Sequence, residues 1–168
     1  IDFPGFGGSE FVELDMISVA ELLTRFLENI KVTRCDVLGH SMGGMLAQIF
    51  CSNNYGLTNK VILSCTHKGF CLPKGTPLVE NYQKRIKERL IMSDIDFGEL
   101  RISEMLPGLE NKEIFNFLSL ISGEITEESI KCGGMAMQTL DTSRPFAYIP
   151  YRLCRIWLWF SACWLCSI

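Results

Sequence analysis

The first third of the chain mixes continuous apolar runs with apolar residues at helical spacing. Short apolar runs occupy 35–38 and 60–65, and a helical pattern over 45–50 lies between them. Upstream, apolar side chains recur every three or four positions, at Val19, Leu22, Leu23, Phe26, Leu27 and Ile30. Ser18, with Glu21 three residues later, predicts a capping box at the start of that helix. This order of elements predicts an α/β fold whose strands form a parallel sheet with right-handed crossovers.

The pattern changes after Cys65, where a loop with several prolines and glycines leads into helical periodicity alone. No strand pattern interrupts the four helices predicted there, at 79–92, 97–106, 112–121 and 126–140. Two arrangements fit this order. The helices either form a separate unit or flank the sheet.

The hexapeptide Gly39-His40-Ser41-Met42-Gly43-Gly44 joins the first apolar run to the following helix. A G-x-S-x-G sequence between a strand and a helix is typical of a nucleophile elbow. Gly39 and Gly43 are expected to remove Cβ atoms that would clash in the sharp turn, and Gly44 is a further small residue where the helix must pack close to the sheet. Ser41 is then the candidate catalytic nucleophile, and the backbone N–H of Met42 is a candidate oxyanion donor. A phosphate loop would need Gly-Lys-Ser/Thr after a longer glycine loop, which this sequence lacks.

A second motif opens the chain, where Asp2-Phe3-Pro4-Gly5-Phe6-Gly7-Gly8-Ser9 follows Ile1. Together with the hexapeptide at 39–44, it resembles the lid-bearing serine hydrolase branch of the α/β-hydrolase superfamily, over about residues 1–141. In that family the first motif ends an inner strand and shapes the site without supplying a catalytic residue. The alternative for this motif is a Gly/Pro-rich loop with no chemistry. The resemblance implies a partial α/β-hydrolase fold: core 1–66 with the elbow, and helical lid 67–141.

Three short sequences within the expected lid look most like 3-oxoadipate enol-lactonase-like hydrolases. They are Thr-His-Lys-Gly-Phe at 66–70, Met-Leu-Pro-Gly-Leu at 105–109 and Gly-Gly-Met-Ala-Met-Gln-Thr-Leu-Asp at 133–141. Esterases and carbon–carbon bond hydrolases share the same lid plan. The resemblance therefore implies a small-molecule ester, lactone or related activated carbonyl as substrate. Haloalkane dehalogenases are excluded, since that branch needs an aspartate where this chain has Ser41.

A serine nucleophile needs a base, and the base needs an orienting acid. His40 adjoins Ser41 and is expected to point away from it and help to pack the elbow. His67 and Phe70 follow the second apolar run and are expected to contribute to substrate binding. Neither histidine stands late in the chain, where the family has its catalytic one. Asp141 precedes the strand that should present the acid, so we expect structural roles for His67 and Asp141.

The last segment, 142–168, differs from the rest of the chain. No Asp or Glu follows Asp141, and all three tryptophans fall in the last twelve residues. The family would continue there with strands that carry the acid and the histidine. A shifted reading frame or a truncation explains this change. A membrane anchor is the alternative, but 156–168 is shorter than the roughly 20 residues a span needs. We expect the family's second oxyanion donor to lie upstream of Ile1.

The composition of the chain limits which partners, metals and cofactors we expect it to bind. A net charge of −3 gives no reason to expect nucleic acid or a membrane surface. Eight scattered cysteines show no metal-ligand spacing, so we expect no metal and no cofactor, and a reducing, cytoplasmic compartment. Three hypotheses remain: part of a serine hydrolase, a catalytically inactive remnant, or a binding module on the same fold.

Overall fold

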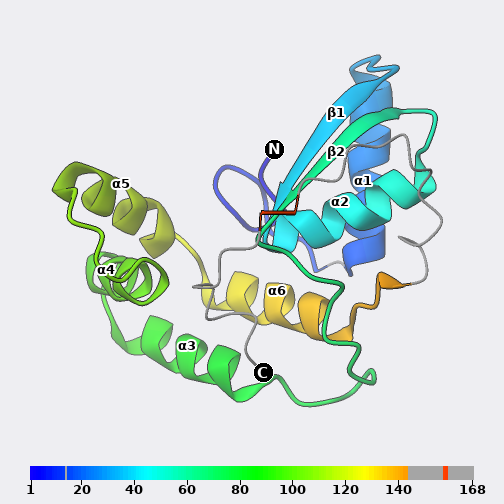
Figure 1. Cartoon of the computed structure of the whole chain (residues 1–168). Coiled ribbons are helices and arrows are strands. Elements are labelled where there is room, and N and C mark those ends of the chain that lie inside the picture. The colour runs from blue at the N-terminus through cyan, green and yellow to red at the C-terminus, as the bar shows by residue number, and fades with distance from the viewer. Residues whose placement is uncertain (14, 144–156, 159–168) are drawn as a thin grey trace. The chain divides into compact units, whose positions relative to one another are not determined.

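The computed structural model describes residues 1–13, 15–143 and 157–158 (Figure 1). Its elements are α1 Met16–Asn29, β1 Cys35–His40, α2 Met42–Asn53, β2 Thr58–Ser64, α3 Glu80–Ile91, α4 Asp94–Met105, α5 Lys112–Gly123, α6 Glu127–Thr139 and β3 Trp157–Leu158. The chain divides into two compact units. One unit combines 1–13 with 77–135, and the other combines 14–76 with 136–168.

The second unit contains the parallel sheet, which confirms the α/β class expected from the sequence. β1 and β2 pair in parallel, with Val37 opposite Val61. β3 pairs with β2 in the same direction, so the strand order is β1-β2-β3. No alternation of apolar and polar residues marks 157–158 in the sequence, and this strand was not predicted. Residues 1–3, where an inner strand was expected to end, form no strand.

Helices cover one face of this sheet. α2 packs against both β1 and β2, and α1 packs along α2 (Figure 1). Val61 and Leu63 point to the covered face and are each only 2% exposed. Successive strand residues face opposite sides, so Leu38 lies on the other face, where it is 69% exposed. The strand ends that carry the elbow are thus fixed from one side by α2.

The start of α1 corrects one prediction. Asp15 is the N-cap, and its carboxylate accepts a hydrogen bond from the Ser18 N–H at 2.8 Å. This bond stabilises the charged carboxylate and lowers the pKa of Asp15. Ser18 is therefore not the cap that the capping-box pattern predicted. Asp15 stands one turn earlier and is at least as good an N-cap residue as serine.

The first unit is built from α3, α4, α5 and most of α6. α4 and α5 pack closely because small residues meet backbone: a Cβ at Gly98 would collide with the Ser119 carbonyl. The loop of the opening motif contacts α6, where the Ser129 hydroxyl donates to the Gly5 carbonyl at 2.6 Å. Each of the four helices was predicted from its periodicity. Whether the unit acts as a lid stays a prediction.

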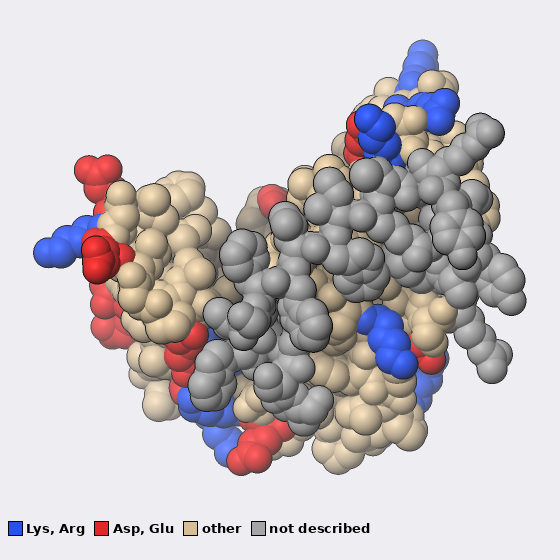
Figure 2. Space-filling view, in the orientation of Figure 1, with Lys and Arg blue, Asp and Glu red and all other residues tan. Residues whose placement is uncertain are grey.

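Charged side chains of both signs are intermixed on the face drawn in Figure 2, among the residues that the structure describes. None of the helices within 1–13, 15–143 and 157–158 is long and apolar enough to cross a membrane. The proposed membrane-anchor alternative concerned 156–168, most of which lies outside the described residues.

Candidate active site

The elbow has the backbone geometry that its sequence predicts. Ser41 stands between the end of β1 and the start of α2, with φ 49° and ψ −120°. A non-glycine residue in this region costs on the order of 1–3 kcal/mol and persists only where its surroundings hold it. Ser41 is therefore a strained residue at the carboxyl end of a parallel strand, where open α/β sheets bind their ligands.

Hydrogen bonds hold the Ser41 backbone on both sides. Its N–H donates to the Ser64 carbonyl of β2 at 3.0 Å. Its carbonyl accepts from the Thr66 hydroxyl at 2.7 Å and from the Gly44 N–H at 2.9 Å. The last residue of β2 and Thr66 after it thus help to hold the serine backbone, a role that the sequence analysis did not assign to Thr66.

Close packing at the elbow requires two of its glycines. A Cβ at Gly39 would lie 2.5 Å from the Gly43 carbonyl oxygen, and one at Gly44 would lie 2.5 Å from the Thr66 Cβ. A Cβ at Gly43 would meet no described atom within 4 Å. The expectation that Gly43 prevents a clash is therefore wrong. Gly44, at the closest approach of α2 to the segment after β2, takes that role.

The two groups expected to do chemistry are not engaged by any other residue that the structure describes. Within the described residues, neither the Ser41 hydroxyl nor the Met42 N–H has a hydrogen-bond partner. Met42 is the first residue of α2, so its N–H is one of the donors that a helix start leaves unpaired. The helix dipole favours negative charge at the same place. An alkoxide or oxyanion formed beside Ser41 would meet an unpaired N–H and a positive helix end.

His67 is held in a loop and has no recorded contact with Ser41. Its Nδ1 accepts the Gly69 N–H at 3.1 Å, and its ring centroid lies 4.8 Å from that of Phe70. Burial lowers the pKa of His67 below its ordinary value. The neutral ring, with its proton on Nε2, is then the stable form. These contacts fit the structural role expected for His67, and substrate binding by His67 and Phe70 stays a prediction.

A buried polar network that the sequence analysis missed supports this loop. Gln48 of α2 is 3% exposed, and its Nε2 donates to the His67 carbonyl at 3.1 Å. Its Oε1 accepts from the Thr142 hydroxyl at 2.6 Å. The Thr142 N–H donates in turn to the Lys68 carbonyl at 2.9 Å. Thr142, which the sequence analysis placed in the atypical tail, is therefore part of this unit's interior. A glutamine within an apolar helix was the one available signal.

The remaining expected residues form no triad with Ser41. His40 is exposed, and its Nδ1 lies 3.3 Å from the Ser64 hydroxyl. Asp141 is exposed and accepts from the N–H and hydroxyl of Ser143, which lower its pKa. No cluster of three or more His, Cys, Asp or Glu side chains within the described ranges could hold a metal ion.

Solved structures of several hydrolases resemble this fold. They include a hydrolase from Pseudomonas aeruginosa PA01 (16% identity, TM-score 0.73), an esterase from Exiguobacterium antarcticum (16%, 0.75) and the enol-lactonase from Burkholderia xenovorans LB400 (15%, 0.73). The alignments cover 93% of this chain but only 58%, 60% and 59% of those chains. The chain therefore spans about three fifths of their length. No curated protein matches it significantly.

A family model supplies the assignment that the low identities do not. The model described as the alpha/beta hydrolase family matches residues 1–154. The match continues past Asp141, so the resemblance covers more of the chain than the expected residues 1–141. Nearly the whole chain matches, and the elbow stands where the motif predicts it; the chain belongs to the alpha/beta hydrolase family.

Proposed function

We propose that this chain carries the nucleophile of a serine hydrolase that cleaves a carboxylic ester, a lactone or a related activated carbonyl. The observation that carries the proposal is the Ser41 backbone, strained at φ 49° at the N-terminus of α2, whose hydroxyl and the neighbouring Met42 N–H have no hydrogen-bond partner among the described residues. Strain of this kind is concentrated at functional sites.

In the proposed reaction, the Ser41 Oγ attacks the acyl carbonyl, and the proton of its hydroxyl passes to a base. The carbonyl oxygen becomes an oxyanion, which the Met42 N–H stabilises. One such donor is worth about 10²- to 10³-fold in rate. The base, the orienting acid and the second oxyanion donor are assigned to residues other than those of this chain. The His67–Phe70 loop lies just after β2, and we assign it to substrate binding.

Two lines of similarity support the ester and lactone class. The solved structures that share the fold include an esterase and an enol-lactonase. The sequences at 66–70, 105–109 and 133–141 resemble enol-lactonase-like hydrolases. In this proposal the helices within 67–141 act as a lid that excludes water and selects the substrate.

The test uses a longer protein in which this sequence is joined to the rest of an alpha/beta hydrolase. That protein should hydrolyse p-nitrophenyl acetate, and Ser41→Ala should reduce kcat by about 10⁴-fold or more. Ser103→Ala, at an exposed position of α4, is the matched control and should leave the rate unchanged. A fluorophosphonate probe should label the protein at Ser41 and not label the Ser41→Ala variant. Turnover that survives Ser41→Ala would exclude this serine as the nucleophile.

The second candidate is a chain that is inactive by itself, as a remnant or a binding module. The observation that favours it is the lack of a base on the Ser41 hydroxyl among the described residues. The 168-residue chain alone should then show no measurable turnover. Clear, Ser41-dependent hydrolysis by this chain alone would show that a base lies within it, and would refute both this second candidate and the assignment of the base to residues outside the chain.

A further inference from the structure

Two arginines one turn apart on α3 differ in how their guanidinium groups are paired. Arg89 donates from Nε to the Ile125 carbonyl at 2.7 Å and pairs with Asp94 at 2.6 Å. Arg85 is half-buried, and its Nε is closed off from water without a hydrogen-bond partner. The rest of its guanidinium has no hydrogen bond or ion pair to any described residue either. Its recorded contact is the Tyr82 ring, 5.1 Å from the guanidinium carbon.

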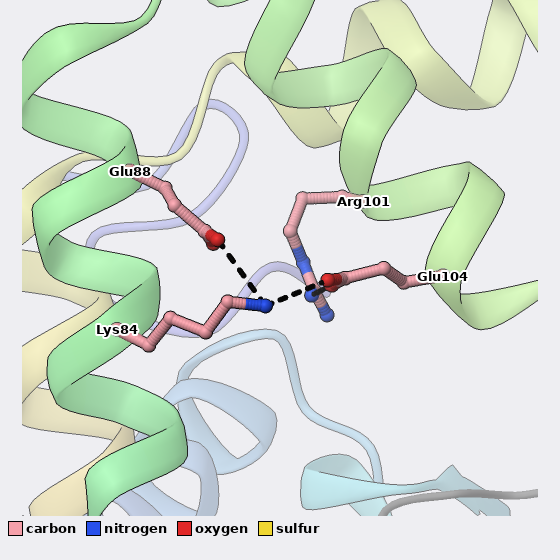
Figure 3. Close-up of polar contacts among 4 residues, drawn as sticks. All are labelled: Lys84, Glu88, Arg101 and Glu104. Atoms are coloured by element: carbon pink, nitrogen blue, oxygen red, sulfur yellow. Dashed lines mark hydrogen bonds and ion pairs between the residues drawn. The ribbon is translucent and has the colours of Figure 1, made fainter.

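The acidic side chains around Arg85 are already engaged by other cations. Lys84 lies 3.3 Å from a Glu88 oxygen and 3.2 Å from one oxygen of Glu104 (Figure 3). The other Glu104 oxygen accepts from Arg101 of α4. Counting Arg85, three cations share two carboxylates, an excess of one positive charge. This part of the helical unit therefore lacks one anion.

The unpaired state of Arg85 is costly for two reasons. A guanidinium keeps its charge at any physiological pH, so closing the Arg85 Nε off from water removes the hydration of that N–H without neutralising the group. Burial and the neighbouring charge of Arg101 both lower the pKa of Arg85. A buried donor without an acceptor is otherwise uncommon in folded proteins. The two terminal nitrogens of Arg85 are not closed off in this way, so an anion placed on them would find N–H donors and balance the excess charge.

We propose that Arg85 binds the carboxylate of a small organic acid in the α3–α4 part of the helical unit. The planar guanidinium matches a carboxylate with two parallel N–H···O bonds. A carboxylate group carries a single negative charge, equal to the excess around Lys84, Arg85 and Arg101. The proposal does not depend on Ser41, because it concerns binding and not turnover.

The experiment measures binding of succinate to the full 168-residue chain by calorimetry, at constant ionic strength, with neutral succinamide as the uncharged control. Succinate should bind saturably and succinamide should not. Arg85→Gln should weaken binding by about tenfold or more, the loss expected for one charged hydrogen-bonded contact. Arg85→Lys should also weaken binding, because an ammonium lacks the planar fork. Lys87→Gln, at an exposed position of the same helix, is the matched control and should stay within about twofold.

A second measurement does not depend on how well the variants fold. The Nε–H resonance of Arg85 in a ¹⁵N spectrum, identified by its loss in Arg85→Lys, should shift with succinate and not with succinamide. No saturable binding, equal binding by Arg85→Gln, or a resonance that succinate leaves unchanged would overturn the proposal. Inorganic phosphate that binds as tightly as succinate would overturn the assignment to a carboxylate.

Dimethyl succinate, which has no carboxylate, is a further uncharged control. Dimethyl succinate that binds as tightly as succinate would overturn the role of Arg85.

Discussion

Replacing Gly44 by alanine is a direct test of the packing that holds the elbow. The new Cβ would lie 2.5 Å from the Thr66 Cβ and 2.6 Å from its Oγ1 and Cγ2. These atoms are at the base of a short side chain and not at the far end of a flexible one. Thr66 would therefore have to move, and its 2.7 Å hydrogen bond to the Ser41 carbonyl would be lost or lengthened.

The expected cost combines two effects. Overpacking of this kind typically costs about 1–3 kcal/mol. Loss of the hydrogen bond from Thr66 adds about 1 kcal/mol. We therefore expect Gly44→Ala to lower the free energy of unfolding by about 2–4 kcal/mol, and Thr66→Ala, which loses only the hydrogen bond, by about 1 kcal/mol.

Urea unfolding followed by circular dichroism measures both changes, with Gly43→Ala as the control. Gly43 is the neighbouring residue in the same helix, and an added Cβ there meets no described atom within 4 Å. Alanine has the higher helix propensity, so Gly43→Ala should be neutral or stabilising by up to about 1 kcal/mol. Equal midpoints for Gly44→Ala and Gly43→Ala would show that the approach of α2 to Thr66 is not tight, and the packing argument would fail.

Two further predictions concern the loop after β2. Thr142→Val should lower the free energy of unfolding by about 1–3 kcal/mol, because it leaves the buried Gln48 Oε1 without a donor. The control, Thr33→Val at an exposed position, should change the free energy of unfolding by less than about 0.5 kcal/mol. Equal effects of the two substitutions would contradict the buried network. The folded-state pKa of His67 is lowered, so its contribution to stability is complete above pH about 6.5 and is lost as the pH falls through the folded-state pKa. His67→Gln should therefore reduce the fall of the urea unfolding midpoint between pH 7.5 and pH 5. If the midpoint of the variant depends on pH as strongly as that of the original chain, His67 is not the cause.

Sequence periodicity predicted the elements well and their ends less well. The helix predicted at 112–121 is observed as Lys112–Gly123. The strand predicted to end at residue 38 continues to His40, because Gly39 and His40 carry no apolar signal although they remain in the ladder with β2. Asp15 replaced Ser18 as the cap of α1 because both residue types compete for the same donors. Local sequence therefore determines which element forms, and side-chain bonds determine where it starts.

The candidate site was predictable only where its geometry is local. The turn at Ser41 follows from the residues on either side of it, and the motif predicted it. The Thr142–Gln48 bond joins residues 94 positions apart, so no local pattern could indicate it. The unpaired state of Arg85 depends on what α4 places beside α3. Predictions about 144–156 and 159–168, including the shifted reading frame, lie outside the described residues.

The segment after β2 and the end of α6 are joined by backbone hydrogen bonds. The Phe70 N–H donates to the Met137 carbonyl at 3.2 Å, and the Leu72 N–H donates to the Gln138 carbonyl at 2.8 Å. The side-chain Nε2 of Gln138 adds a bond to the Thr76 carbonyl at 2.9 Å. The chain that carries the helices between residues 76 and 137 therefore leaves the sheet-containing unit and returns to it at two segments that are hydrogen-bonded to each other. Loop-closure entropy grows only slowly with the length enclosed. We therefore expect that the enclosed helices can be changed in number or sequence, or replaced in engineering, while the backbone that positions Ser41 is retained.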